Sequence, residues 1–332
     1  MARLHKEFIH FNRELKLTTV RKDGLKNSRK EIKRKIRNWF DENKPDELQP
    51  KFAGQGSFET NTIVNPIPEY ENDVILRRYD LDYGIYFIEN DGEDNKRAIE
   101  TWHNWVFEAV EDHTDQAPIK KNTCVRVIFA DGHHLDLPIY YKKDGIITLA
   151  HKTKDWIESD PKEFYDWFNT EKNAQIERIV RYLKAWKNYR ESKNSSVKLP
   201  SGFSLTILAV NNYAEFDNDD QSFRETIWKM HSELSRTAGF KCLRPTTPVG
   251  EDVFQEYSET RKTNFMNALE SLLGDMERAD DEKNFREASE ILRNNQFGSR
   301  FPLGEDKDDD KKSASIAAAL GAAGIKPKPY GY

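Results

Sequence analysis

The chain has 332 residues, of which 37% are hydrophobic and 33% are charged, and its formal net charge is −5 at pH 7. This length suffices for one large domain or two lobes. The negative charge argues against a uniformly basic nucleic-acid binder, and no apolar run is long enough to span a membrane. Cys124 and Cys242 are too few for a disulfide framework, and no Cys/His cluster has zinc spacing. Because the N-terminus is not followed by the apolar core of a signal peptide, we expect a cytoplasmic protein.

The N-terminal region contains two helical patterns. Residues 4–20 mix apolar and charged positions as a short amphipathic helix does. Asn27 or Ser28 can cap a second helix, in which Ile32 and Ile36 begin an apolar stripe. Its many basic residues resemble a nucleic-acid patch or a solvated helix face, and the negative charge of the whole chain favours the solvated face.

A glycine-containing stretch, Gly54 to Ser57, follows the two helices. Glycine permits a tight turn whose backbone N–H groups are free to face a phosphate, and a serine hydroxyl adds one donor. Alone this signal is weak, because ordinary turns often contain Gly-Ser. The polar stretch that follows, with Pro66 and Pro68, predicts a surface loop.

Asp80 and Asp82 are two positions apart in a run of aromatic and branched residues, which predicts a β-strand. Residues at i and i+2 of a strand point to the same face, so the two carboxylates come together. Like charges at such a separation repel each other unless a cation lies between them. Mg²⁺ is the expected cation, because it takes oxygen ligands from carboxylates and substrate phosphates.

A third carboxylate comes from a predicted hairpin. Residues 124–130 are rich in strand formers, Asp131-Gly132 is a strong turn signal, and residues 135–141 form the return strand. We expect the return strand beside the strand of Asp80, with Asp136 completing a three-acid cluster. Taken alone, Asp136 would be read as a solvated edge residue, and it is the combination of motifs that favours a site. We treat His133 and His134 as ordinary strand residues, because Mg²⁺ prefers oxygen.

The rest of the chain is predominantly helical up to its tail. Helical periodicity occurs in residues 96–112, 162–190, 221–237, 251–276 and 282–295. Lys184 falls at the edge of an apolar stripe, where a lysine usually reaches towards solvent. From Glu305 the composition changes abruptly, which predicts a mobile tail that is either simply disordered or binds a partner.

The Gly-Ser loop, the Asp-x-Asp strand and the later aspartate together resemble the polymerase-β-like nucleotidyltransferases. Residues 55–58 and 79–84 are specifically similar to the bacterial cGAS/DncV-like (CD-NTase) family of CBASS antiphage systems, and the resemblance covers most of residues 1–303. It implies an α+β fold with a mixed sheet, flanking helices, a C-terminal helical lobe and an active site in the cleft between them. The implied domains are a catalytic core with N-terminal helices, a helical lobe like that of oligoadenylate synthases and a flexible tail: residues 1–160, 161–303 and 304–332.

The resemblance also implies the roles of the site residues. Asp80, Asp82 and Asp136 would hold two Mg²⁺ ions, for which Mn²⁺ could substitute, and would be the catalytic residues. Gly56 and Ser57 would hold the β- and γ-phosphates of a nucleoside triphosphate, with ATP as the expected substrate. Four further residues complete the implied nucleotide site: Lys184 and Ser201 at the triphosphate, Phe203 as a base-stacking ring, and Gln55 as a further nucleotide-binding residue.

The implied function is synthesis of a cyclic di- or trinucleotide second messenger with release of pyrophosphate, in antiphage signalling. Two alternatives stay open: a linear oligonucleotide synthase, and a catalytically silent module that binds nucleotide or a partner. Related enzymes are controlled through their C-termini, so a regulatory protein at the tail and a downstream effector of the product are expected partners. We expect neither membrane attachment nor direct nucleic-acid binding.

Overall fold

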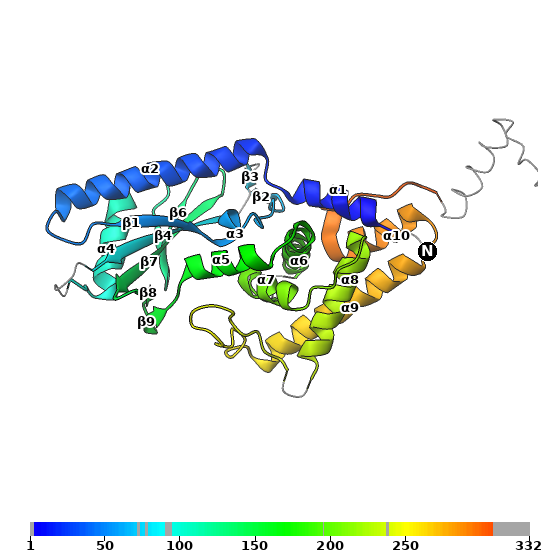
Figure 1. The fold of residues 1–332 in the computed structure, drawn as a ribbon. Helices are drawn as coiled ribbons and strands as arrows, with labels where there is room; N and C mark the ends of the chain where they lie inside the picture. Colours follow the sequence, from blue (N-terminus) through cyan, green and yellow to red (C-terminus); the bar gives the residue numbers. More distant parts are fainter. Residues whose placement is uncertain are drawn as a thin grey trace, which may run out of the picture.

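The computed structural model describes residues 3–71, 74–76, 79–89, 95–194, 196–236 and 239–307. It contains a mixed sheet and a separate group of helices (Figure 1). The strands are β1 (Lys51–Gln55), β2 (Glu69–Glu71), β3 (Val74–Leu76), β4 (Asp80–Ile88), β5 (Ile119–Lys120), β6 (Cys124–Ile128), β7 (His134–Lys143), β8 (Ile146–His151) and β9 (Asp155–Glu158). The helices are α1 (His5–Leu15), α2 (Thr19–Asn43), α3 (Gly56–Glu59), α4 (Ile99–Val110), α5 (Pro161–Glu171), α6 (Ala174–Lys193), α7 (Gly202–Asn211), α8 (Asp219–Leu234), α9 (Glu259–Asp281), α10 (Phe285–Leu292) and the short turns η1 (Arg293–Phe297) and η2 (Gly298–Arg300).

The main sheet has seven strands. Its order is β1-β4-β7-β6-β5, and β8 pairs with both β7 and β9. β4 and β7 are parallel, whereas β1 runs antiparallel to β4 and β6 runs antiparallel to β7. The hairpin predicted around Asp131-Gly132 is confirmed, with Gly132 at a φ of +91° that favours glycine. The return strand therefore lies directly beside the strand that carries Asp80 and Asp82.

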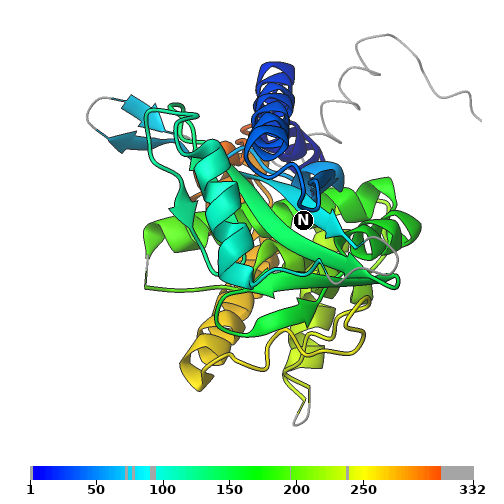
Figure 2. The ribbon, with the colours of Figure 1, turned by 90° about the vertical axis from the view of Figure 1, so that its left-hand side faces the viewer.

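One face of the sheet is buried under α2 and α4. Leu81, Tyr83, Ile85 and Phe87 of β4 alternate into this core, where Phe87 stacks on Trp102 of α4 with ring centroids 4.5 Å apart. Figure 2 shows α2 and α4 close to each other against the sheet. Because side chains of a strand alternate between faces, the even-numbered residues of β4 are left on the opposite face.

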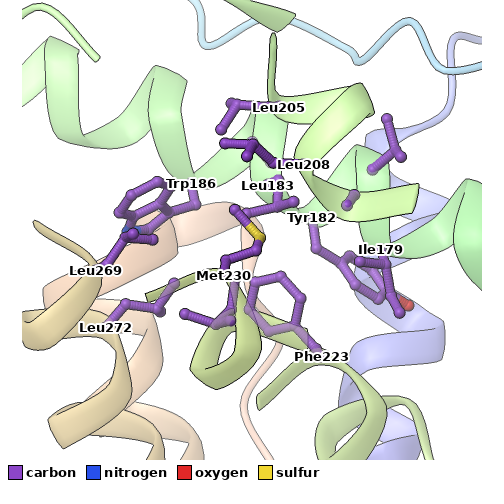
Figure 3. Close-up of a cluster of buried hydrophobic side chains, with 14 of the residues drawn as sticks. Ile179, Tyr182, Leu183, Trp186, Leu205, Leu208, Phe223, Met230, Leu269 and Leu272 are labelled. Atoms are coloured by element: carbon purple, nitrogen blue, oxygen red, sulfur yellow. The ribbon is translucent and has the colours of Figure 1, made fainter. Parts of the chain in front are cut away.

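A second hydrophobic cluster lies among the helices. Figure 3 shows its centre, where Trp186 and Leu183 of α6 meet Met230 of α8 and Leu269 of α9. These residues are buried completely, which is the expected source of stability for helices whose apolar stripes face one another. The mixed sheet with flanking helices and a helical cluster confirms the predicted α+β class.

Helix α1 belongs to this second cluster. Phe8 and Phe11 are fully buried, and Phe8 packs against Tyr182, Phe223 and Phe301 with ring centroids 5.1–5.6 Å apart. Figure 1 shows α1 alongside α8. The predicted catalytic core, residues 1–160, includes both N-terminal helices. Helix α1 instead packs into the cluster of the helical lobe. The division at residue 160 otherwise stays a prediction.

Several predicted helix boundaries are wrong for identifiable reasons. The first helix ends at Leu15, and α2 begins after Thr18, whose hydroxyl accepts a hydrogen bond from the Arg21 N–H. Asn27 and Ser28 therefore lie inside α2 and do not cap it. The helical region predicted over 162–190 is found as two helices, α5 and α6, because Asn173 caps α6 by accepting from the backbone N–H groups of its first turn.

The predicted tail lies mostly outside the described residues, which end at Lys307. Gly304, the first residue of that predicted segment, donates its N–H to the hydroxyl of Ser289 at 2.7 Å. Within the described parts of the chain, no helix combines the length and apolar character needed to cross a bilayer.

Candidate active site

The three predicted carboxylates lie on one face of the sheet. Asp80 and Asp82 are on β4, opposite the face packed by α2 and α4, and Asp136 is the direct neighbour of Asp82 in the parallel β4–β7 register. The predicted juxtaposition of the three acids is therefore confirmed, although their chemical roles stay predictions.

Asp82 is the most perturbed acid of the cluster. Burial raises the pKa of its carboxyl to about 7, and the charges of Asp136 and Asp80 add to the rise. Gly56 holds the chain close to this carboxylate, since a Cβ at Gly56 would lie 2.1 Å from Asp82 Oδ2 and the φ of Gly56 is +72°. Glycine has no Cβ to collide with Asp82 and adopts a positive φ without strain, so it is the residue that fits this position.

Arg126 is a site residue that the sequence interpretation missed. It lies opposite Asp136 in the β6–β7 register and donates two hydrogen bonds of 2.7 Å to that carboxylate. Its guanidinium also lies 3.2 Å from Asp80 Oδ1. Burial raises the pKa of Asp80, but His134 and Arg126 outweigh that effect and lower the pKa below its ordinary value. A basic residue directly across the predicted hairpin was the available signal.

The donor set suits a hard divalent cation. Three carboxylates on one face supply the oxygen ligands that Mg²⁺ and Mn²⁺ prefer. The pKa of Asp82 is raised first by burial and then by the charges of Asp136 and Asp80, and a cation would offset both effects. As the side chains stand in the part of the chain that the structure describes, no group of three or more His, Cys, Asp or Glu residues is arranged to hold a metal ion. Arg126 instead lies between Asp80 and Asp136.

A cavity of about 580 Å³ opens beside Asp80 and Asp82, whereas Asp136 is not among the described residues that line it. It is lined from the sheet side by Gln55, Gly56, Ser57, Asp80 and Asp82, and from the helical side by Lys184, Gly202, Phe203 and Arg244. The cavity thus brings together predicted residues from both halves of the chain. Its volume lies in the range of small-molecule sites.

Gln55 lies at the cavity wall, but its amide is engaged by the sheet. Its Nε2 donates to the hydroxyl of Tyr140 at 3.1 Å, and the ring of Tyr140 stacks on Tyr86 with centroids 4.7 Å apart. In this arrangement the side chain of Gln55 supports the loop from beneath. The neighbouring Gly56 and Ser57 begin the short helix α3 at the cavity.

Lys184 reaches the cavity from α6. Its ammonium donates to the hydroxyl of Thr62 at 2.7 Å, and a Cβ at Gly202 would lie 3.1 Å from its Cε. Burial lowers the pKa of Lys184 to about 7, the charge of Arg181 lowers it further, and Asp82 opposes the shift. The lysine is therefore held inside the protein and does not extend into solvent.

Ser201 has a different position from the one expected. Its hydroxyl caps α7 by accepting from the Ser204 N–H at 3.1 Å, and the described residues that line the cavity include Gly202 but not Ser201. The next residue, Gly202, lies in the cavity wall, where Ser201 was expected.

Phe203 does line the cavity, as predicted. Its ring lies 4.5 Å from that of Phe164 and 5.4 Å from the guanidinium of Arg244, measured between ring centroids and from the guanidinium carbon. Arg244 and Phe164, both in the cavity wall, were not predicted as site residues: Arg244 lies outside the periodic stretches, and the helical periodicity around Phe164 does not show that its ring faces a cavity.

Comparison with known proteins supports the predicted relationship. Residues 50–140 match the family model described as the nucleotidyltransferase domain of cyclic GMP-AMP synthase DncV-like proteins. Cyclic GMP-AMP synthase from Escherichia albertii is 30% identical over 196 residues, covering 56% of this chain and 42% of that protein. The cyclic GMP-AMP synthase of Vibrio cholerae serotype O1 is 24% identical over 273 residues, covering 64% and 59%. The chain thus spans about half the length of these curated relatives.

Solved structures show the same fold over nearly the whole chain. Vibrio cholerae DncV cyclic AMP-GMP synthase with the linear intermediate 5' pppA(3',5')pG has a TM-score of 0.74 at 21% identity, covering 91% of this chain and 99% of that one. Its form with 3'-deoxy ATP has a TM-score of 0.76 at 22% identity, covering 90% and 96%. The similarity of fold therefore extends beyond residues 50–140, and over residues 50–140 the chain is similar to the nucleotidyltransferase domain of DncV-like proteins.

Proposed function

We propose that this chain is a template-independent nucleotidyltransferase that joins nucleoside triphosphates into a cyclic dinucleotide and releases pyrophosphate. The observation that carries the proposal is that the Gly56–Ser57 loop, Asp80, Asp82 and Lys184 all line the same cavity. These are the groups needed to hold a triphosphate beside a carboxylate cluster. Relatives named cyclic GMP-AMP synthase, and the relative whose structure contains a linear intermediate, support a cyclic product.

The chain's own residues have distinct roles in this proposal. Gly56, Ser57 and Lys184 bind and orient the triphosphate. Asp80, Asp82 and Asp136 would together hold the cations, and Asp136, which neighbours Asp82 in the β4–β7 register, would also accept the proton of the attacking ribose hydroxyl. When bound, two Mg²⁺ ions would neutralise the departing pyrophosphate and lower the pKa of that hydroxyl.

Closure of the ring follows from the same chemistry applied twice. The first transfer joins the hydroxyl oxygen of one nucleotide to the α-phosphorus of another, and pyrophosphate leaves. The linear product keeps its own 5'-triphosphate, so turning it round in the cavity presents that triphosphate to the same loop and lysine. A role in antiphage signalling, an effector for the product and a regulatory protein acting on the tail, residues 304–332, belong to this proposal.

The test compares wild type with an Asp80→Ala/Asp82→Ala variant. A Glu215→Ala/Asp217→Ala variant is the matched control, because it removes two exposed carboxylates two positions apart. Each protein is incubated with Mg²⁺ or Mn²⁺ and with ATP, GTP, CTP and UTP, singly and mixed, followed by phosphatase and mass spectrometry. We expect a phosphatase-resistant product from wild type and the control only, with the site variant normally folded by circular dichroism.

Other outcomes assign the alternatives. A phosphatase-sensitive ladder indicates a linear synthase, and triphosphate binding without pyrophosphate release in the presence of either metal indicates a silent binding module. Turnover like that of wild type in the double aspartate variant would exclude the proposed catalytic role of the cluster.

A further inference from the structure

Thr62 lies between Lys184 and the Gly56–Ser57 loop, and its side chain is fully buried. The Lys184 ammonium donates to Thr62 Oγ1 at 2.7 Å, and Thr62 Oγ1 lies 2.9 Å from Thr60 Oγ1. Thr60 in turn donates to the carbonyl oxygen of Gly56 at 3.2 Å. Three consecutive hydrogen bonds therefore join the lysine to the loop.

The direction of these hydrogen bonds is fixed by their ends. In its protonated form, which is the form that binds a triphosphate, Lys184 only donates, so Thr62 accepts from it and the Thr62 proton is free to donate to Thr60. A carbonyl oxygen only accepts, so Thr60 directs its proton to Gly56. Each hydroxyl is used once as donor and once as acceptor, and the chain of bonds is complete without water.

The backbone around Thr62 is held by other contacts. The N–H groups of Thr62 and Ile63 both donate to the carbonyl oxygen of Ser57 at 2.9 Å. Arg181 donates to the carbonyl oxygen of Asn61 at 2.5 Å. Removal of the Thr62 hydroxyl alone therefore leaves the segment anchored and acts mainly on Lys184.

We propose that Thr62 is a positioning residue, whose hydroxyl sets the Lys184 ammonium at the place where it and the Gly56–Ser57 loop engage the same triphosphate. This inference rests on the proposed function. Among the described residues, the other oxygen within hydrogen-bond reach of the ammonium is the Thr62 carbonyl, at the longer distance of 3.4 Å. Without the hydroxyl, the lysine loses its best-placed acceptor.

The experiment measures dissociation constants for a nonhydrolysable triphosphate and for the matching nucleoside, in Mg²⁺. We expect Thr62→Val to weaken triphosphate binding about tenfold, as loss of one buried hydrogen bond to a charged group does. Nucleoside binding should stay unchanged, and Thr62→Ser should restore the triphosphate affinity. Thr226→Val is the matched control, because Thr226 is also fully buried and accepts one backbone hydrogen bond, from Ala214, away from the cavity.

A double-mutant cycle separates positioning from stability. In a Lys184→Met background, Thr62→Val should have no further effect on triphosphate affinity, because the group it positions is gone. An equal loss in both backgrounds, an equal loss for the nucleoside, or triphosphate binding like that of wild type would overturn the inference. If Thr62→Val and Thr62→Ser both failed to fold, the hydroxyl would belong to stability and the inference would also fall.

The outcome distinguishes this inference from the proposed function. Wild-type protein that neither binds triphosphate nor releases pyrophosphate would overturn both. If wild-type protein is active and the Thr62→Val variant is equally active, the proposed function stands and only the positioning role of Thr62 is overturned.

Discussion

Arg126 determines how much negative charge the carboxylate cluster presents to a cation. Its guanidinium makes a bidentate contact with Asp136 and a 3.2 Å contact with Asp80. The hydrogen bonds to Asp136 raise the pKa of Arg126 further, so this group stays charged at any working pH. A positive charge at this position competes with a divalent cation for the same oxygens.

We predict that Arg126→Gln binds Mn²⁺ at least about fivefold more tightly than wild type. Removing the positive charge of Arg126, about 4 Å from a bound cation, should favour cation binding by on the order of 1 kcal/mol or more at a partly exposed site. A free-energy change of about 1 kcal/mol corresponds to a roughly fivefold change in affinity. The readout is free Mn²⁺ measured by electron paramagnetic resonance, without nucleotide. Arg37→Gln, on the α2 side of the sheet beside Phe52, is the charge-matched control. Unchanged or weaker Mn²⁺ binding in Arg126→Gln would contradict the competition.

Lys184 leads to a pH dependence of triphosphate binding. Its pKa in the free chain is about 7, chiefly because of burial and then because of Arg181. As the pH rises through 7, the free lysine loses the proton that the triphosphate requires, so affinity should fall by up to about tenfold per pH unit until the pKa of the bound form is reached. Titration from pH 6 to 9 should show this decline in wild type and a flatter profile in Lys184→Arg. Parallel profiles would assign the titration to another group, such as Asp82.

Among single residues, the sequence predicts those whose positions follow from a fixed structural repeat or a turn motif. Asp80 and Asp82 share a face because strands have a period of two, and Asp136 follows from the Asp-Gly turn. Thr62 could not be predicted, because its role depends on how a loop meets α6. Ser201 was misplaced because a helix N-cap and a phosphate ligand favour the same kind of residue.

The sequence predicts helices and strands well where their hydrophobic pattern repeats. It predicts their ends poorly where a single capping residue determines the boundary. The apolar stripe of α6 and the strands that carry Asp80, Asp82 and Asp136 are found as predicted. Boundaries were less accurate, because Thr18 and Asn173 are single polar residues among many that could cap a helix. Periodicity identifies the buried face of α1 but not its partner, so its place in the helical cluster was not visible.

Because α1 is part of the helical cluster, Phe8 should be important for the stability of that cluster. Phe8 contacts four aromatic rings, those of Tyr182, Phe223, Phe297 and Phe301. We predict that Phe8→Ala lowers the free energy of unfolding by about 3–5 kcal/mol, as large cavities in aromatic cores do. Urea unfolding followed by tryptophan fluorescence measures it, with Val20→Ala as control because Val20 is 82% exposed. A loss below about 1 kcal/mol would mean that α1 is only loosely attached.

The whole molecule is organised around two hydrophobic clusters that meet at the cavity. One contains the sheet with α2 and α4, and the other contains α1 and the helices from α5 onward. Segment 60–65 joins them, since Lys184 and Arg300 of the helical side donate to the Thr62 hydroxyl and the Asn65 carbonyl oxygen. A sequence pattern predicts each cluster but not these cross-connections, which depend on loop backbone atoms.

This organisation predicts how the chain unfolds with and without substrate. Two clusters connected mainly by polar contacts should unfold in overlapping but separate steps, so the calorimetric enthalpy should exceed the van't Hoff enthalpy in the free protein. A nonhydrolysable triphosphate with Mg²⁺ contacts both sides of the cavity and should raise the melting temperature and bring the enthalpy ratio towards unity. Lys184→Met should reduce this effect of the triphosphate on the enthalpy ratio, because it removes one of the charged side chains that line the cavity from the helical side. A ratio of unity in the free protein would show that the two clusters already form one cooperative unit, and would end the division proposed near residue 160.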